Sequence, residues 1–163
     1  MTEAKAAGPL KNLKVLDIST IIAGATASTM LSDFGADVIK VELPSRPDGL
    51  RQLPPHKDGE PLWWKVTNRN KRCITLDVKN PEGAALFKSM LPKFDVLVEN
   101  FRPGTLEKWG LGPDELHKIH PALTILRVSA YGQKGPYAAR PGFARVGEAM
   151  SGFQTLVGDA DGP

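Results

Sequence analysis

The sequence predicts an α/β protein with a mostly parallel sheet and helices on both faces. Five short apolar runs alternate along the chain with segments of helical periodicity. The first unit of run, helix and run takes about thirty residues, which is the size of a right-handed parallel crossover. At 163 residues, the chain is long enough for one domain with a core, or for part of a larger one.

The first crossover is the clearest unit. Residues 13–18 form an apolar, β-branched run, which predicts the first strand. After a turn at residues 19–24, apolar residues follow at helical spacing up to Gly35, which is a typical helix stop. Residues 37–42 then predict the second strand. The helix is expected to carry the apolar residues Ala23, Ala27, Met30, Leu31 and Phe34.

The next segment, residues 44–61, is rich in proline, glycine and charge, so it predicts a long exposed loop. Trp63 and Trp64 end this loop; they could form a stacking surface, but anchoring the loop on the core is the favoured role. Residues 72–78 predict the third strand. Asn80 and Pro81 then start a helix as its cap and first residue, and Pro92 ends it. The buried face of this helix is expected to include Phe87, Met90 and Leu91.

The last elements are shorter. An apolar run at residues 95–98 predicts a buried strand, and a helical turn opens at Thr105 after the break at Pro103 and Gly104. A short helix at residues 114–119, a strand at 123–128, a Gly/Pro-rich turn at 131–137 and a helix at 143–150 follow. Residues 158–163 have turn composition, which more often leads into further structure than closes a domain.

Composition limits the classes of function. The 21 cationic and 18 anionic residues are interleaved, which argues against a nucleic-acid surface and fits a site with a few local cations. Cys73 is the single cysteine, so no internal disulfide is possible, and a packed structural thiol is the favoured interpretation. No apolar stretch has the length of a signal peptide core or a membrane span. A cytoplasmic location is therefore the expectation.

A candidate ligand site follows the strand at residues 95–98. Asn100, Phe101, Arg102, Lys108 and Trp109 lie where a strand ends and a helix begins. In open α/β sheets, ligands bind at the carboxyl ends of strands. An amide, two aromatic rings and two cations suit a ligand with a flat ring and phosphates, although an ordinary connection with surface charges explains them equally well.

Other chemistries are less well supported. Glu42 ends the second strand, where dinucleotide-binding domains place a ribose-binding acid. However, the turn after the first strand has one glycine, Gly24, where a pyrophosphate fingerprint needs three. The sequence contains no P-loop and no nucleophile-elbow serine. The histidines, His56, His117 and His120, form no metal-ligand pattern with each other or with Cys73, so no metal site is expected.

Several stretches together resemble the family III coenzyme A transferases, the formyl-CoA and carnitine CoA-transferase (CaiB/BaiF) group. They occur in the order found in that family and cover nearly the whole chain. They are residues 13–18 with Ala23 and Gly24, residues 31–42, 70–77 and 98–104, and residues 132–137 with 140–142.

The resemblance implies an acyl-CoA substrate and transfer of CoA to a free acid, with a dicarboxylic acid favoured. An aspartate attacks the thioester in that family, giving a mixed anhydride and then an enzyme-bound CoA thioester. CoA is thus a substrate, and no tightly bound cofactor is expected. Motif matching places the CoA contacts at Ile22, Ala23, Leu76, Lys79, Asn100, Phe101, Arg102, Lys108 and Trp109. Lys79, Lys108, Arg46 or Arg51 are the candidates for binding the phosphates.

The resemblance further implies a Rossmann-like large domain, of which residues 1–163 are the N-terminal, CoA-binding part. The catalytic aspartate would lie beyond Pro163, because Asp159 and Asp161 belong to the preceding turn. The chain is therefore expected to be inactive by itself, and the full-length form is expected to be an interlocked homodimer.

Two alternatives to the transferase remain open. One is a relative of the α-methyl acyl-CoA racemases, in which a Gly-His-Asp stands where this chain has Gly142, Phe143 and Ala144. Loss of that imidazole removes one of the two proton-transfer groups, which lowers this alternative. The other is a non-catalytic CoA-binding or nucleotide-binding module.

Overall fold

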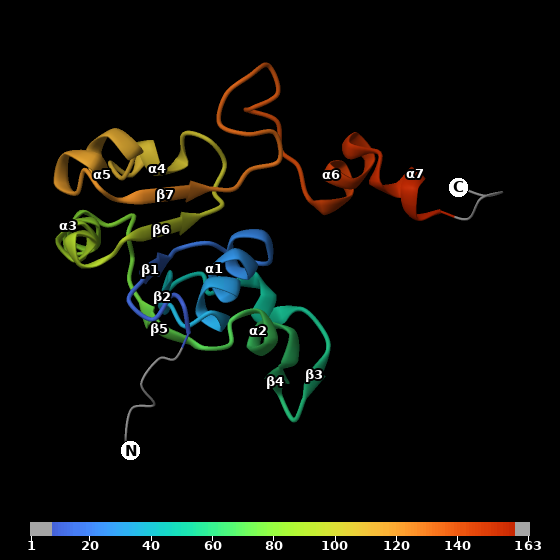
Figure 1. Ribbon diagram of the computed structural model, residues 1–163, viewed down its shortest axis with the longest axis horizontal. Coiled ribbons are helices and arrows are strands. Elements are labelled where there is room, and N and C mark those ends of the chain that lie inside the picture. The colour runs from blue at the N-terminus through green and yellow to red at the C-terminus, as the bar shows by residue number, and fades with distance from the viewer. Residues whose placement is uncertain (1–7, 159–163) are drawn as a thin grey trace. The chain divides into compact units, whose positions relative to one another are not determined.

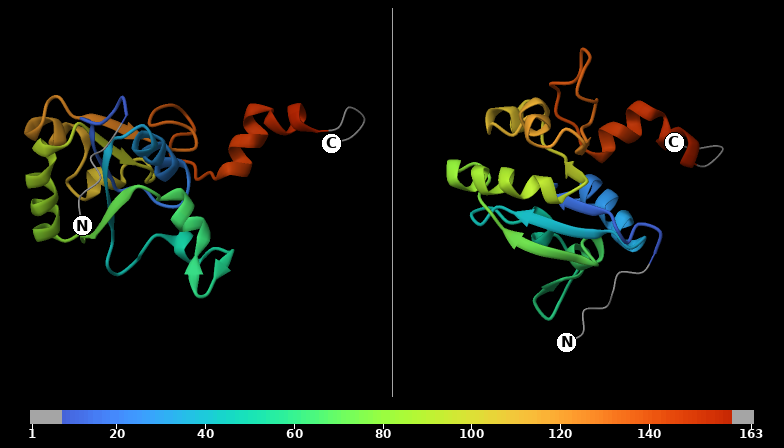
Figure 2. Two further views of the ribbon diagram at one scale, coloured as in Figure 1. Left: turned by 60° about the horizontal axis from the view of Figure 1, so that its bottom comes forward. Right: turned by 60° about the vertical axis from the view of Figure 1, so that its left-hand side comes forward.

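The computed structural model describes residues 8–158, which fall into two compact units that divide between Val128 and Ser129 (Figure 1). The first unit holds a five-stranded sheet with the order β5-β2-β1-β6-β7, in which every strand pair is parallel. Figure 2 shows β5, β2 and β1 side by side. The predicted parallel sheet is thus confirmed. Its strands are β1 (Lys14–Asp17), β2 (Asp37–Glu42), β5 (Lys71–Thr75), β6 (Val96–Glu99) and β7 (Thr124–Arg127).

Helices cover both faces of the sheet, as the sequence predicted. Successive residues of a strand point to opposite faces, and β1 shows the division. Leu16 packs in a large cluster with Phe87 of α3 and Leu116 of α5, whereas Val15 packs in a smaller cluster with Leu31 of α1. The helices of this unit are α1 (Ala23–Asp33), α2 (Leu62–Thr67), α3 (Pro81–Met90), α4 (Thr105–Lys108) and α5 (Pro113–Ile119).

The buried face of α1 differs from the predicted one. Met30 and Phe34 are 57% and 55% exposed, and the buried side of the helix consists of small and hydroxylated residues. The reason is a polar interior beneath α1, where the Ser28 hydroxyl donates a hydrogen bond to Asp17 at 2.6 Å and the Thr29 hydroxyl donates to the Thr67 carbonyl. The buried residues of α1 are Gly24, Ala25, Ser28, Thr29 and Ser32.

The segment between β2 and β5 is more structured than the predicted loop. It contains a 3-10 turn (Gly49–Gln52), a small hairpin of β3 (His56–Lys57) and β4 (Glu60–Pro61), and α2, which the sequence analysis missed. Leu50 is fully buried and Asp48 nearly so. Trp64 lies under the Arg51 guanidinium at 3.5 Å, while Trp63 is 39% exposed. One tryptophan of the pair therefore anchors this segment.

Helix α3 confirms the predicted start signals. The Asn80 side chain accepts a hydrogen bond from the Glu82 amide at 2.9 Å, and Pro81 is the first helical residue. Phe87 and Leu91 are fully buried, as expected. Strand β5 ends at Thr75, three residues earlier than predicted, because the chain turns there toward the helix. A 3-10 turn (Leu91–Lys93) follows α3, and Pro92 lies within it.

The second unit contains the helices α6 (Ala144–Ser151) and α7 (Phe153–Val157). Gly152 joins them with a φ of 73°, a left-handed conformation that favours glycine. Helix α6 agrees with the predicted helix at 143–150, whereas α7 was not predicted. Asp159 and Asp161 lie outside the described residues. Within residues 8–158, no helix has both the length and the apolar character needed to cross a membrane.

Candidate functional site

The candidate site starts where the sheet divides between β1 and β6. The chain leaves β1 toward β2 on one side and leaves β6 toward β7 on the other, so the segments after these two strands diverge. This is the position at which open α/β sheets bind ligands. Asn100, directly after β6, closes the gap: its amide nitrogen donates to the Thr20 carbonyl at 2.7 Å, and its oxygen accepts from the Thr20 amide at 2.8 Å. Asn100 therefore fixes the segment after β1.

The same segment is held from the β2 side. Ile21 has a φ of 63°, which is strained for a β-branched residue. Its amide donates a hydrogen bond to Asp48 Oδ1 at 2.9 Å. The other oxygen of Asp48 lies 3.1 Å from Lys40 Nζ as an ion pair, without a well-oriented hydrogen bond. The segment after β1 is thus held from both neighbouring strands in a conformation that it would not adopt alone.

A buried layer of charge supports this arrangement. Asp17, Lys40 and the Lys71 side chain are all fully buried. Lys71 Nζ lies 2.9 Å from Asp17, and Lys40 Nζ donates to the Ser19 carbonyl at 2.8 Å. Burial by itself would raise the pKa of Asp17, but the ammonium groups of Lys40 and Lys71 and the hydrogen bonds from Ser19 and Ser28 lower it overall. Asp17 is consequently an ionised structural carboxylate.

Two of the predicted aromatic residues form a pair. The rings of Phe101 and Trp109 meet edge to face, with centroids 5.0 Å apart. Trp109 follows α4, and Lys79 Nζ lies 5.6 Å from the centre of the indole ring. On its other side, Phe101 lines a cavity of about 30 Å³ together with Thr20, Arg46 and Glu42. This cavity has room for about one water molecule, so a larger ligand would have to lie outside it.

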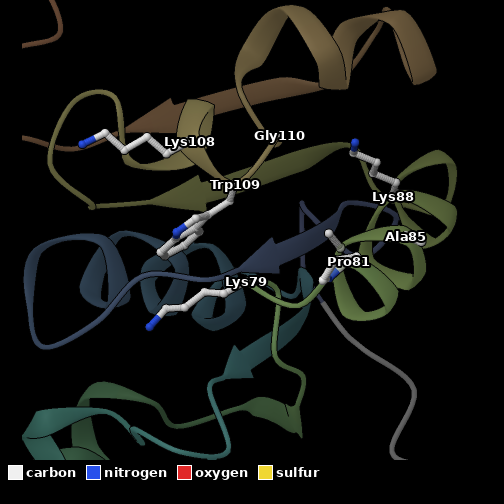
Figure 3. A pocket seen from close by; sticks show the side chains of 8 residues that line it. Lys79, Pro81, Ala85, Lys88, Lys108, Trp109 and Gly110 are labelled. Carbon is white, nitrogen blue, oxygen red and sulfur yellow. The ribbon is translucent and has the colours of Figure 1, made fainter.

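The larger opening lies between α3 and the turn after α4 (Figure 3). This cleft has a volume of about 500 Å³, within the range of small-molecule sites. The predicted residues Lys79, Lys108 and Trp109 line it, together with Lys88 and an aliphatic wall from α3. The wall consists of Pro81, Ala84 and Ala85. We call this opening the lysine cleft.

The lysine cleft is strongly cationic. Among the described residues, Lys79, Lys88 and Lys108 make no ion pair or hydrogen bond through their ammonium groups, and no carboxylate lines the cleft. Figure 3 shows Lys79 and Lys108 on one side of Trp109 and Lys88 on the other. Three positive charges around an indole ring and an aliphatic wall suit a ligand with several phosphates and a flat ring. Sequence reasoning missed Lys88, because it lies far along α3 from the strand ends.

The remaining predicted CoA residues are spread around this region. Ile22 and Ala23 lie at the start of α1, where both are exposed. Leu76 is half-buried against the main core cluster, and Arg102 is exposed in the turn before α4. The structure therefore brings Lys79, Phe101, Lys108 and Trp109 together, and it gives Asn100 a clamping role beside them.

Of the other phosphate candidates, Arg51 is committed elsewhere. Its guanidinium makes two hydrogen bonds to Glu42, at 2.7 and 3.0 Å, while stacking on Trp64. Glu42 is consequently occupied as well, and it does not present the free acid that a ribose would need. Arg46 is exposed and lines the small cavity beside Phe101.

The remaining candidates for reactive side chains are Cys73 and the histidines. Cys73 is exposed on the edge strand β5 and is not the packed thiol that was expected. Partial desolvation and the Glu42 carboxylate raise the pKa of its thiol, which makes it a poor nucleophile. Ring nitrogens of His117 and His120 lie 2.9 and 3.1 Å from backbone carbonyls. Among residues 8–158, no group of three or more His, Cys, Asp or Glu side chains could hold a metal ion.

Comparisons with known proteins agree on one family. The family model described as CoA-transferase family III matches residues 10–163. A succinyl-CoA–D-citramalate CoA-transferase of Chloroflexus aurantiacus is 46% identical over all of this chain and 41% of its own length. The succinyl-CoA–L-malate CoA-transferase beta subunit of the same organism is 52% identical over 92% of this chain and 37% of its own.

A solved structure gives the same answer. The crystal structure of a CAIB/BAIF family protein from Brucella suis superimposes with a TM-score of 0.87 and 37% identity, over 94% of this chain and 42% of that one. The chain thus spans about two fifths of the length of the relatives it matches.

Proposed function

The chain belongs to CoA-transferase family III, and on this premise we propose that it is the CoA-binding part of an enzyme that moves CoA from an acyl-CoA thioester to a free carboxylic acid. The observation that carries the proposal is the lysine cleft beside the Phe101–Trp109 pair. CoA has a flat adenine ring, a diphosphate and a separate 3′-phosphate. Lys79, Lys88 and Lys108 would neutralise phosphates, and the indole of Trp109 would contact the base.

Preorganisation supports the same proposal. The segment after β1 is fixed by Asn100 on one side and by Asp48 on the other before any ligand arrives. A binding surface that is already rigid loses less conformational entropy when it takes up a long, flexible ligand such as CoA. Ile22 and Ala23 follow this segment directly, so their backbone is presented in one geometry.

The names of the relatives suggest the substrates. Both Chloroflexus proteins are named for succinyl-CoA together with a dicarboxylic acid, citramalate or malate. We extend this pairing to the present chain: an acyl-CoA donor such as succinyl-CoA, and a dicarboxylic acid acceptor. Because these relatives are named as transferases and Phe143 stands where the racemases have histidine, we extend the transferase activity and not the racemase activity to this chain.

The chemical step needs a carboxylate nucleophile that is held against the thioester carbonyl. Of the carboxylates near the strand ends, Asp17, Glu42 and Glu99 are buried and paired with cations, so they are unsuited to this attack. The proposed nucleophile is the family aspartate outside these 163 residues. We therefore propose that this chain alone binds CoA without turnover, and that the full-length form works as a homodimer.

Isothermal titration with CoA tests the binding proposal on the purified protein. Replacing Lys79 or Lys108 by Ala should weaken binding by about 1–3 kcal/mol each, as for a hydrogen bond to a charged group. The matched control is Lys93→Ala, because Lys93 is an exposed lysine of the same unit that does not line the lysine cleft. Added salt should weaken CoA binding by the wild-type protein, since it screens the ammonium groups.

Three outcomes would each contradict a part of the proposal. Absence of CoA binding by the wild-type protein would refute the CoA function itself. Equal affinity in the Lys79, Lys108 and Lys93 variants would remove the lysine cleft as the site. Steady CoA exchange between succinyl-CoA and malate by these 163 residues alone would refute the claim that the nucleophile lies elsewhere.

A further inference from the structure

A second fully buried carboxylate, Glu99, ends strand β6 directly before Asn100. Its two oxygens have different partners. Oε2 accepts a hydrogen bond from the Phe101 amide at 2.6 Å, and Oε1 accepts one from Arg127 Nε at 2.7 Å. Burial raises the pKa of Glu99, although the Arg127 hydrogen bond opposes this effect. The carboxylate thus links the backbone of Phe101 to the end of β7.

The opposite side of the Arg127 guanidinium reaches α4. Its Nη1 and Nη2 donate to the two oxygens of Glu107 at 2.8 and 3.2 Å. Glu107 directly precedes Lys108 and Trp109. Its side chain is also crowded by Gly112, where an added Cβ would lie 3.0 Å from Glu107 Cγ. All three guanidinium nitrogens are therefore used to tie β6, β7 and α4 together.

From this geometry, we propose that Arg127 is a positioning residue of the ligand site: by bridging Glu99 and Glu107, it sets the distance between Phe101 and the pair Lys108–Trp109. This inference rests on the proposed CoA function. Arg127 does not line the lysine cleft, so its effect on a ligand there passes through these neighbours.

The requirement is for a guanidinium, and a positive charge alone does not meet it. Arginine presents a rigid planar fork that can serve two carboxylates at once, whereas the single ammonium of lysine cannot reproduce three fixed donors. In Arg127→Lys, the ammonium cannot keep both contacts. Either Glu107 loses its two-bond contact or Glu99 loses its buried hydrogen bond. The Glu107 side chain is 44% exposed and can be solvated by water, so its ion pair would be lost first. Helix α4 would then no longer be tied to β7.

Four variants test the proposal in a background where Trp63 and Trp64 are replaced by Phe, so that Trp109 is the single tryptophan. Glu107→Gln weakens only the contact with α4, because the amide loses the charge and one of the two acceptor oxygens, and Arg127→Lys keeps the positive charge. Arg127→Met removes the positive charge together with the contacts to Glu99 and Glu107. The control is Arg72→Met, because Arg72 makes a similar two-bond ion pair with Asp37 on β2, away from the cleft.

In Glu107→Gln and Arg127→Lys, we expect the Kd for CoA to rise about fivefold or more, as when one charge-assisted hydrogen bond is lost from a binding site. Trp109 emission should shift, since its contact with Phe101 changes. Arg72→Met should match the background in both measurements. Arg127→Met should lose more affinity than Arg127→Lys, and Arg127→Lys should not restore the affinity of the background protein.

The outcomes separate the two proposals. If the background protein binds CoA and both Glu107→Gln and Arg127→Lys keep its affinity and Trp109 emission, Arg127 has no positioning role. If the background protein does not bind CoA although the unsubstituted chain does, the affinity comparison is made with all three tryptophans present. If the unsubstituted chain itself does not bind CoA, the proposed function fails, and the positioning role in CoA binding fails with it.

Discussion

Replacing Asp17 by Asn removes a negative charge from the centre of the sheet while the side chain keeps its size. Asp17 accepts four hydrogen bonds: Oδ1 receives the Ser19 amide at 2.9 Å and the Ser19 hydroxyl at 2.5 Å, and Oδ2 receives Ser28 at 2.6 Å and Lys71 at 2.9 Å. An asparagine oxygen can replace one oxygen of the carboxylate. Its amide nitrogen would face the donors of Ser28 and Lys71 on the other side.

The size of the destabilisation follows from the two hydrogen bonds that Oδ2 accepts and that the amide nitrogen cannot accept. Ser28 retains a carbonyl acceptor, Ala25 O at 3.0 Å, so most of the cost falls on Lys71, which is fully buried at its side chain. Removing one partner of a buried ion pair typically costs about 3–5 kcal/mol, because the remaining charge is uncompensated. We expect Asp17→Asn to lower the free energy of unfolding at pH 7 by this amount.

The measurement is urea unfolding of the wild-type protein, Asp17→Asn and a control, Asp37→Asn. Asp37 also belongs to an ion pair in the same sheet, with Arg72, but the side chains of Asp37 and Arg72 are 40% and 63% exposed. Exposed pairs contribute about 0–1 kcal/mol, so the control should change little. Losses within about 1 kcal/mol of each other in the two variants would contradict the claim that burial makes Asp17 different.

The difference in unfolding free energy between the wild-type protein and Asp17→Asn should also depend on pH in a defined direction. The pKa of Asp17 is lowered in the folded protein from its ordinary value of 3.8. A lowered carboxyl pKa contributes stability that is fully present above the unfolded value and is lost as the pH falls through the folded value. The gap between the wild-type protein and Asp17→Asn should therefore be constant at neutral pH and shrink below about pH 4.

Two further predictions concern single positions. Gly83→Ala should cost about 2 kcal/mol or more in unfolding free energy, because its Cβ would lie 2.0 Å from the Asp77 carbonyl oxygen; Gly147→Ala, a helical glycine with open space around it, is the control and should not destabilise. Equal effects would show that packing at Gly83 is not tight. Asn100→Ala breaks both hydrogen bonds to Thr20 and should weaken CoA binding by about 1–3 kcal/mol; unchanged affinity in titration would mean that the clamp does not shape the site.

The elements with local signals were predictable from sequence. The start of α3 depends on Asn80 and Pro81, which act within one helical turn, and the strands are short apolar runs. Helix α2 was missed because the proline-rich segment before it favours a loop, while its own stability comes from Trp64 packing under Arg51. The exposed face of α1 was misjudged, because nothing local shows that Ser28 and Thr29 meet polar partners from β1 and α2.

For the site, the sequence placed Lys79, Lys108 and Trp109 at the ends of two strands, and the parallel topology then brought them to one cleft. The sequence could not indicate Lys88, because its side chain reaches the cleft only through the packing of α3 beside the turn after α4. Cys73 was expected to be packed, but it lies on the edge strand and is exposed.

The sequence by itself determined the five strands of the parallel sheet, the helices with clear local signals and the family, because caps, apolar periodicity and ordered motifs are local properties of the chain. Only the tertiary structure decided which polar and charged groups meet. Asp17 pairs with Lys71 across 54 positions, Asn100 clamps Thr20 across 80, and Arg127 joins Glu99 to Glu107. These pairs form because the parallel sheet and the segments that connect its strands bring together residues that are far apart in the sequence, and burial there makes each unpaired charge costly.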